Sequence, residues 1–465
     1  MKIWLLNIAL VLSFLQEGTA QDTHYNAQQP DSKGTLNGGT GTAGSRELSA
    51  IFYNPGIVAF FEKSNLSING NLYVYDYIRL TANAAVATNE LKGETFQTMP
   101  SLLAGTFKWK KSERWTTSYI YLNNGYYINR LKSFSNSSKN LNNTEYLLNQ
   151  RYDVRTRYRD DWIGGGVSYK VNDKIGVGIV SFLNFFSQNF VQRSYSELVQ
   201  AKQANILEWS FLDYRETNLF NVGLSFDLGI VYTTEEHEFG FNIITPRISI
   251  TPLSYSSIER QQQEVNADSI SYSSVLLDPD FKAIKKVPIQ INLGYAWFRN
   301  HSVFKVRLSF SGAVAPYVMG KESHNSYRQG MFTQADQYDF LPVSSSRSVV
   351  NLGLGYEWRI HEKLKMVTGA RTDFTFMDKS MYRYADFSNT IVNWNIYHIS
   401  AGIDWSHKWL RINAGFDYGF SYQKGISEFF NPDDFNKPIQ EVGLSTNTHV
   451  LYQQVKIFLG LILSF

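Results

Sequence analysis

Strict alternation of apolar and polar residues recurs along this chain of 465 residues and is clearest over residues 410–422. Every even position there is apolar, from Leu410 to Tyr422, whereas the odd positions include Asn413 and Asp417. A period of two places successive side chains on opposite faces of a β-strand. The same pattern recurs over residues 221–232, 289–297, 351–358 and 397–405. The chain is therefore predicted to be all-β, with strands that have one apolar and one polar face.

The C-terminal stretch, QQVKIFLGLILSF, keeps every second residue apolar up to the final Phe465. Such a strand resembles the closing strand of bacterial outer-membrane barrels, in which a terminal Phe serves as an assembly signal. A β-sandwich strand is the alternative, but sandwich strands rarely sustain this pattern to the last residue. The resemblance implies that the barrel-assembly machinery is a partner and reads Phe465.

The alternating segments number about fourteen, and their connections differ systematically in length. The expected strands are residues 66–80, 99–110, 114–126, 158–171, 174–189, 216–233, 237–252, 285–299, 302–316, 347–360, 363–377, 393–406, 409–424 and 448–465. Connections of a few residues alternate with long ones at 81–98, 127–157, 190–215, 253–284, 317–346, 378–392 and 425–447. Short turns at one end and long loops at the other are typical of outer-membrane barrels.

Composition agrees with a transmembrane antiparallel β-barrel. Aromatic residues make up 15% of the chain, and charged residues make up 18%, against roughly 25% in soluble domains. After residue 20, no apolar run approaches the ~18 residues that a spanning helix needs, so only a closed barrel could cross a membrane. Tryptophans lie beside the short turns, as expected of aromatic girdles at the membrane boundary: Trp109, Trp115, Trp297, Trp358, Trp405 and Trp409.

Residues 1–20 have the pattern of a secretory signal peptide, with one lysine, a short apolar core and a small-x-small ending at Ala20. A membrane anchor is the alternative, but the apolar core is short for one. The chain has no cysteine, which excludes lipid attachment at the cleavage site, thiolate metal sites and thiol nucleophiles. A net charge of +3 gives no reason to expect a nucleic-acid partner.

Residues 21–64 precede the first strand and contain ELSAIFYNPGIV at positions 47–58. Fourteen strands leave an open lumen with a polar wall, and this segment has polar residues that could pair with that wall. Pro55 ends any helix begun at 47–53, and Gly56 permits a tight turn. We expect residues 21–64 to form a compact plug inside a barrel of residues 65–465. Residues 39–44 match G-x-G-x-x-G but lie outside any βαβ unit, so they are interpreted as a flexible lead-in.

The motif around Asn54, Pro55 and Gly56, together with the strand number and the terminal Phe, resembles the FadL-type outer-membrane transporters of long-chain fatty acids and aromatic hydrocarbons. That family carries an N-terminal hatch with an Asn-Pro-Ala motif, and Gly56 replaces its Ala. The resemblance implies passive transport of hydrophobic molecules across the outer membrane of a Gram-negative bacterium. Some similar barrels are instead non-transporting subunits of protein-secretion complexes. A receptor or adhesin that uses the long loops is a third possibility, and the sequence leaves both alternatives open.

The family binds ligand between two long external loops, and the third long connection here is residues 190–215. The near-helical spacing of apolar residues predicts a helix over residues 194–212. Its apolar face either binds a hydrophobic ligand or packs on the barrel rim. The candidate ligand-binding residues are Leu198, Ile206, Trp209 and Leu212. FLNFF at 182–186 interrupts the alternation and is interpreted as a bulge or an apolar port.

Charged residues of both signs share the inward parity of neighbouring strands. They include Lys305, Arg307, Glu357, Lys365, Arg371, Asp373, His398, Asp404, Arg411 and Asp417. Mixed signs predict ion pairs that brace the lumen and hold the plug; a carboxylate headgroup at Lys365, Arg371 or Arg411 is the sharper alternative.

No nucleophile–base arrangement, metal-ligand spacing or cofactor motif stands out, so we expect a monomer with membrane lipid and a hydrophobic ligand as partners, and neither enzyme activity nor a cofactor or metal.

Overall fold

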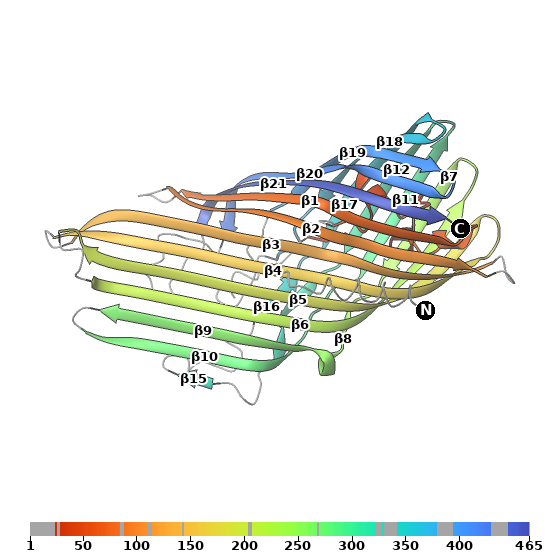
Figure 1. Cartoon of the computed structure of the whole chain (residues 1–465). Coiled ribbons are helices and arrows are strands. Elements are labelled where there is room, and N and C mark those ends of the chain that lie inside the picture. The colour runs from red at the N-terminus through yellow and green to blue at the C-terminus, as the bar shows by residue number, and fades with distance from the viewer. Residues whose placement is uncertain are drawn as a thin grey trace, which may run out of the picture.

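The computed structural model describes residues 24–25, 28–83, 88–109, 114–141, 144–202, 207–266, 269–321, 327–329, 342–378, 394–428 and 445–464. The wall is a closed antiparallel β-barrel of fourteen strands, which confirms the predicted class and strand number (Figure 1). These strands are β1 (Asn65–Asn83), β2 (Thr88–Lys108), β3 (Trp115–Leu141), β4 (Thr144–Lys170), β5 (Ile175–Gln200), β6 (Leu207–Thr233), β7 (His237–Ile244), β11 (Gln290–Arg299), β12 (Ser302–Ser311), β17 (Val349–His361), β18 (Leu364–Asp373), β19 (Ile396–His407), β20 (Leu410–Glu428) and β21 (Ser445–Ser464). Each pairs with its neighbour, and β21 pairs with β1 to close the ring.

Shorter elements complete the structure. They are α2 (Ser32–Leu36), α3 (Ala50–Tyr53), η1 (Ile57–Phe60), β8 (Ile248–Ser249), η2 (Thr251–Leu253), β9 (Tyr255–Asn266), β10 (Ser269–Ala283), β13 (Val314–Val318), β14 (Gly320–Lys321), β15 (Tyr327–Gln329) and β16 (Val343–Ser346). Among the described residues, no helix has the length and apolar character needed to cross a membrane.

The alternation in the sequence corresponds to the two faces of the wall. Ser400, Asp417 and Lys456 are paired on β19, β20 and β21, and all three are buried on the inner face. On the outer face, the neighbouring Phe416 and Ile457 are 48% and 46% exposed. A barrel in a membrane has this arrangement, because its outer surface faces lipid hydrocarbon and its interior is polar.

Exposed tryptophans lie close to the short turns, where the outer surface changes from apolar to polar. Trp115, Trp358 and Trp409 are 45%, 47% and 57% exposed. Amphipathic indole rings favour the boundary between hydrocarbon and headgroups, so these residues mark one edge of the apolar belt.

The sheet divides along β6. Residues 227–233 of β6 pair with β7, which leads to β11, whereas residues 209–220 pair with β9, which leads to β10. The strands β3–β6, β9 and β10 extend well beyond the other strands, toward the left of Figure 1. Predicted strands 237–252 and 285–299 are therefore interrupted after Ile244 and before Gln290.

The predicted helix over residues 194–212 is wrong. β5 continues to Gln200, β6 begins at Leu207, and Leu198 pairs with Trp209 across the two strands. Apolar residues at helical spacing here belong to two strands. The segment extends past the apolar belt, so its outer face no longer gives a clear period-two signal.

Other segments expected to be long loops are also strands, because β1–β4, β9 and β10 extend through much of 81–98, 127–157 and 253–284. The predicted bulge at 182–186 is absent from the pairing of β5 with β4 and β6. Alternation continues there: Phe182 and Phe186 are buried on the inner face, and Leu183 is 43% exposed. This part of the inner wall is apolar, which hid the alternation in the sequence.

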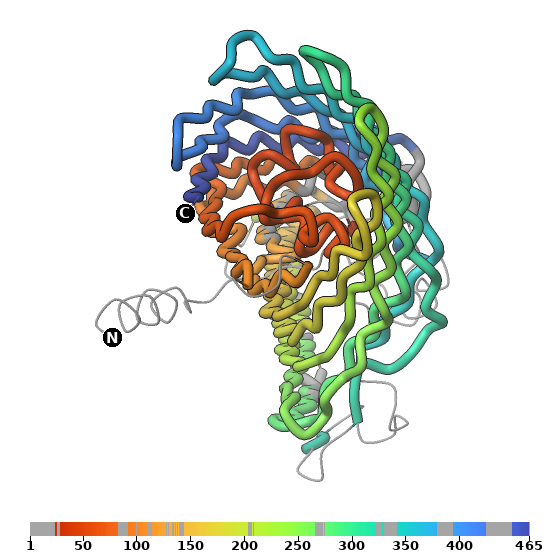
Figure 2. The backbone as a smooth tube through the Cα atoms, turned by 90° about the vertical axis from the view of Figure 1, so that its right-hand side faces the viewer, coloured from red at the N-terminus to blue at the C-terminus, as the bar shows by residue number. Residues whose placement is uncertain are grey.

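Residues 28–61, here called the N-terminal segment, lie within the ring of strands, where Figure 2 shows them in red. Their α2 contacts β18–β21 and β1, and their η1 contacts β3–β6, so the segment touches opposite sides of the wall. Residues 1–23 and Phe465, on which the export and assembly expectations depend, lie outside the described residues.

Candidate functional site

The Asn54-Pro55-Gly56 turn is fixed to the wall by hydrogen bonds. Asn54 is fully buried, and its Nδ2 donates to the carbonyl oxygens of Thr42 (3.0 Å) and Ile230 (2.9 Å). Its Oδ1 accepts from the amide of Gly56 at 3.0 Å, and the Ser168 hydroxyl donates to the Pro55 carbonyl at 2.7 Å. One asparagine thus joins the turn to another part of the segment and to β6.

Glycines on the wall let the segment approach backbone to backbone. A Cβ on Gly56 would lie 2.8 Å from the carbonyl oxygen of Gly176 and 3.0 Å from that of Gly229. Gly56 has an ordinary helical φ of −61°, so close approach, and not an unusual turn, requires glycine there. The expectation that Gly56 serves to permit a tight turn is therefore wrong. Close packing against the wall explains why glycine stands at the third position of the motif. On β7, a Cβ on Gly240 would lie 1.9 Å from the Thr42 carbonyl oxygen.

Residues 38–45 are ordered by the wall, which corrects their interpretation as a flexible lead-in. They are buried, and Gly38, Gly39 and Gly44 have φ values of 60°, 75° and 69° that favour glycine. Arg307 donates to the Gly39 carbonyl at 3.0 Å, and Glu238 accepts from the Gly44 amide at 2.6 Å.

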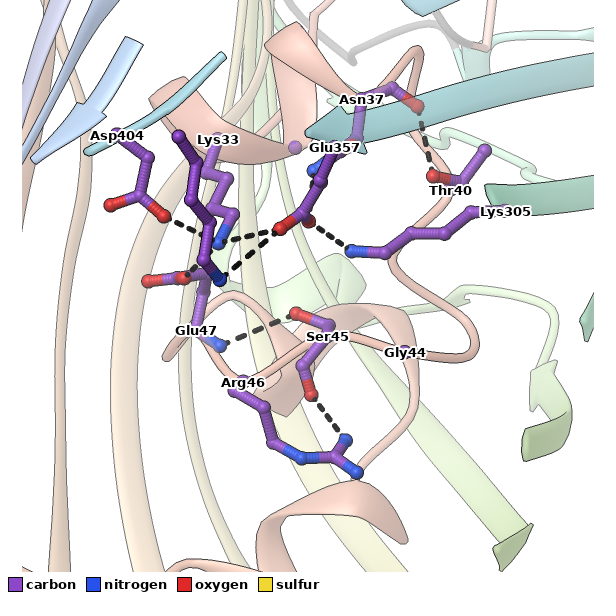
Figure 3. A network of polar contacts seen from close by, with 12 residues as sticks. Lys33, Asn37, Thr40, Gly44, Ser45, Arg46, Glu47, Lys305, Glu357 and Asp404 are labelled. Carbon is purple, nitrogen blue, oxygen red and sulfur yellow. Dashed lines mark hydrogen bonds and ion pairs between the residues drawn. The ribbon is translucent and has the colours of Figure 1, made fainter. Parts of the chain in front are cut away.

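A ring of ion pairs joins the segment to β12, β17 and β19 (Figure 3). The ammonium of Lys33 lies 2.8 Å from Asp404, 3.1 Å from Glu47 and 3.3 Å from Glu357. Glu357 also accepts from Lys305 and from the Asn37 amide. Burial lowers the pKa of Lys33, but Glu357, Glu47 and Asp404 outweigh burial and raise it above its ordinary value. Lys33 is therefore charged throughout the physiological range.

The predicted polar wall separates into two clusters. Lys365 and Arg411 join the Lys33 ring, Lys365 3.6 Å from Glu357 and Arg411 2.7 Å from Glu47. The second cluster lies further along β18–β20: Arg371 binds Asp417 at 2.7 Å, and His398 Nδ1 lies 3.0 Å from Asp417. Asp404 belongs to the first cluster, through Lys33 and Arg411. The predicted wall residues that make these ionic contacts inside the barrel are Lys365, Arg371, His398, Asp404, Arg411 and Asp417.

Asp31 caps α2 inside the barrel, and its Oδ1 accepts from the Gly34 amide at 3.0 Å. Burial and the neighbouring Glu47 carboxylate raise the pKa of Asp31 from 3.8 to about 7. The docked segment therefore holds a proton between pH 4 and 7 that the undocked segment would release. The contribution of Asp31 to docking is therefore largest below pH 4 and is lost as the pH rises to 7, by a few kcal/mol in total.

We expect Asp31→Asn to remove this pH dependence while retaining the cap, because asparagine is an equally good capping residue. The measurement is the labelling rate of a unique cysteine at Ala50, normalised at each pH to denatured protein. Labelling should accelerate from pH 5 to 8 in the parent and stay level in Asp31→Asn. Equal pH dependence in both would refute the assignment to Asp31.

An apolar cluster lies on the other side of the segment. Phe52 of α3 packs edge-to-face on Trp162 and Phe182, at centroid distances of 5.8 Å and 6.4 Å. Trp162 donates to Asp160, which also accepts from Nη2 of Arg247 at 2.6 Å and 2.7 Å. The Nε and Nη1 atoms of Arg247 are buried and have no hydrogen-bond partner among the described residues. A buried guanidinium with unused donors is the feature of this region that fits an anionic group.

A cavity lies beside Asp160, the ion-pair partner of Arg247. Tyr158, Lys285 and Tyr317 line it, and His24 and Tyr25 reach it from the N-terminal end. Lys285 lies over the Phe186 ring at 4.7 Å, so a cation and an aromatic ring are in contact beside the cavity. The free space is about 40 Å³, room for a few waters and too little for an acyl chain.

Sequence reasoning missed Arg247, because strand 237–252 was expected to be continuous. Pro246 was the available signal: a proline lacks the donor that an interior strand needs, and the strand breaks there. Pro288 marks the matching break before β11. The two breaks bring Arg247 and Lys285 to the lumen.

The candidate loop residues do not form one surface. Leu198 and Trp209 share the inner face of the extended β5–β6 sheet, and the Trp209 indole donates to Glu264 at 2.8 Å. Leu212 pairs with Tyr195 on the opposite face, and Ile206 lies outside the described residues. None of the described three lines the cavity beside Arg247.

Comparison with solved structures finds the same fold in several channels. A FadL homologue from Pseudomonas aeruginosa is 14% identical, with 97% of this chain and 100% of that chain covered and a TM-score of 0.57. The toluene transporter TodX of P. putida is 12% identical, with 94% and 98% covered and a TM-score of 0.58. The toluene transporter TbuX of Ralstonia pickettii is also 12% identical, with 94% and 98% covered and a TM-score of 0.54. No protein-family model and no curated protein sequence matches the chain.

Proposed function

We propose that this barrel, which has the fold of the FadL-type channels, passes hydrophobic small molecules such as long-chain fatty acids across the outer membrane of a Gram-negative bacterium. Transport is passive: transfer of apolar surface out of water supplies roughly 25 cal/mol per Å². The barrel acts as a monomer, residues 1–20 direct its export, and Phe465 directs its assembly.

The observation that carries the proposal is Arg247, whose unused donors lie beside aromatic rings. Its guanidinium stands 5.9 Å from the centroid of Trp162, which belongs to the apolar cluster around Phe52. A molecule with a carboxylate and an acyl chain matches both features: the acid takes the free donors, and the chain lies on the rings. The similar solved channels support the same class of cargo.

The N-terminal segment acts as the hatch. This is supported by its contacts with opposite sides of the wall and by the cavity beside Asp160, whose free space of about 40 Å³ is too small for an acyl chain. Entry requires residues such as His24 and Tyr25 to move, and onward passage requires the hatch to shift against the glycines of the wall.

Removing the guanidinium tests the proposed binding site. We expect Arg247→Met to weaken palmitate binding by about tenfold or more, as the loss of a charge-assisted hydrogen bond implies. Hexadecanol has the same chain without the carboxylate, so its binding should be nearly unchanged. The measurement is equilibrium binding of both probes to purified, folded barrel.

Arg359→Met is the matched control, because Arg359 is an exposed arginine near the short turn after β17. It should leave both affinities at the parent value. Equal loss of palmitate and hexadecanol in Arg247→Met would show a general packing defect. Absence of binding by the parent, with a stably associated protein instead, would favour a subunit of a larger complex.

A further inference from the structure

The outer apolar belt ends at one level on three neighbouring strands. Going away from the short turns, outward positions change from Ile163 to Asp161 on β4 and from Phe185 to Ser187 on β5. On β6, the outward positions change from Phe220, which pairs with Ser187, to Asn218. At about 3.3 Å per residue and a tilt of about 40°, the eight steps along β4 from Tyr169 to Asp161 rise about 20 Å, close to the height of such belts.

Arginines gather on the outer face directly beyond this edge. They alternate along β4 and continue on β3 and β5: Arg130, Arg155, Arg157, Arg159 and Arg193. The long connections lie at this end of the barrel, so the cluster is on the extracellular side of the belt.

The arrangement concentrates like charge. Arg130 and Arg155 are directly opposite each other in the β3–β4 ladder, and like charges in that relation are destabilising. Arg130 is paired with Asp153 at 2.9 Å, and Arg193 lies over the Tyr214 ring at 5.1 Å. These contacts hold the guanidinium groups of Arg130 and Arg193 in place.

A groove of about 530 Å³ lies across β3–β6 and is lined by Arg130, Arg155, Arg157 and Arg193. Asp153 and Glu216 are the acidic groups in its lining, so cations exceed anions by two. The side-chain amides of Asn189 and Asn218, also in the lining, both donate to the Glu216 carboxylate, at 3.3 Å and 3.1 Å. Four guanidinium forks around one groove match an anion with several oxygens, and phosphate is such an anion.

We propose that this groove binds the phosphorylated sugar headgroup of an outer-leaflet glycolipid of the lipid A class. The phosphates lie among the arginines, and the acyl chains run down the belt over Leu183, Phe185 and Phe220. A lipid fits better than a protein, because the groove opens outward at the upper edge of the apolar belt. The proposal rests on the outer-membrane location but not on transport or on the hatch.

The test measures binding of diphosphoryl lipid A to the purified barrel in neutral detergent, with phosphatidylcholine as the comparison lipid. We expect the parent to prefer diphosphoryl lipid A by about tenfold or more, and Arg155→Gln/Arg157→Gln to lose that preference. Arg155→Lys/Arg157→Lys should retain part of it, because lysine keeps the charge but not the fork. Palmitate binding should remain at the parent level in all variants, which separates this site from the proposed transport function.

Arg359→Gln/Lys363→Gln is the matched control, because it removes two exposed cations at the opposite edge of the belt. It should bind lipid A as the parent does. Equal binding of lipid A and phosphatidylcholine by the parent would overturn the proposal. Unchanged lipid A binding in Arg155→Gln/Arg157→Gln would also overturn it, as would displacement of the bound lipid by inorganic phosphate at a similar concentration.

Discussion

Gly240→Leu is expected to open the barrel to small water-soluble solutes. A Cβ at this position would lie 1.9 Å from the Thr42 carbonyl oxygen and 2.9 Å from Asn54 Nδ2. The first contact is with backbone, so no side-chain rotation relieves it, and the N-terminal segment must leave its place. Liposomes with the variant should swell rapidly in a disaccharide solution, whereas liposomes with the parent barrel should not.

Gly165→Leu is the control for a leucine introduced into a wall strand. Gly165 faces outward on β4, and a Cβ there would meet nothing closer than the Ser118 carbonyl oxygen at 3.9 Å. This variant should stay closed to the disaccharide. Heat-dependent mobility on gels establishes that both variants form barrels. A folded Gly240→Leu barrel that excludes the disaccharide would contradict the docking geometry.

Glu357→Gln is expected to release the segment by breaking the ion-pair ring. The substitution keeps the shape but removes a carboxylate that is ion-paired with Lys33, Lys305 and Lys365. Among the described residues, Glu357 is the only ion-pair partner of buried Lys305, which is then left without a counterion. Removing one partner of a buried pair costs about 3–5 kcal/mol, so opening of the segment should become at least about 100-fold more frequent. The chain has no cysteine, so the labelling rate of a single Ala50→Cys reports this opening directly.

Two further variants identify the cause. Glu362→Gln, at the exposed turn that follows the same strand, should leave the labelling rate unchanged. Adding Lys305→Met to Glu357→Gln removes the unpaired cation and should restore part of the protection. If Glu357→Gln alone labels at the parent rate, the ring does not hold the segment.

Much of the wall could be predicted from the sequence, because lipid outside and polar groups inside enforce alternation. The signal is strong where the outer face is wholly apolar, as at Phe416 and Ile457. It fails beyond the belt, where residues such as Leu198 and Trp209 lie in long strands whose faces are both mixed. A local apolar pattern there matched a helix as well as two strands, and only the pairing of β5 with β6 distinguishes them.

The interior could be predicted only in part. Parity placed Lys305, Glu357 and Asp404 on the inner face, but not their convergence on Lys33, which depends on how the segment lies in three dimensions. Gly240 looked like any small residue in a strand, although close backbone approach explains its presence. Arg247 is brought to the lumen by a strand break, and Pro246 was the only signal in the sequence that indicated this break.

We propose that the N-terminal residues close this barrel to water-soluble solutes, and that the barrel nevertheless admits hydrophobic molecules. The most direct measurement follows two probes together in liposomes carrying the unmodified protein: a fluorescent long-chain fatty acid and a disaccharide. The fatty acid should enter faster than in protein-free liposomes while the disaccharide stays excluded. Entry of both probes, or no acceleration of the fatty acid, would contradict the account.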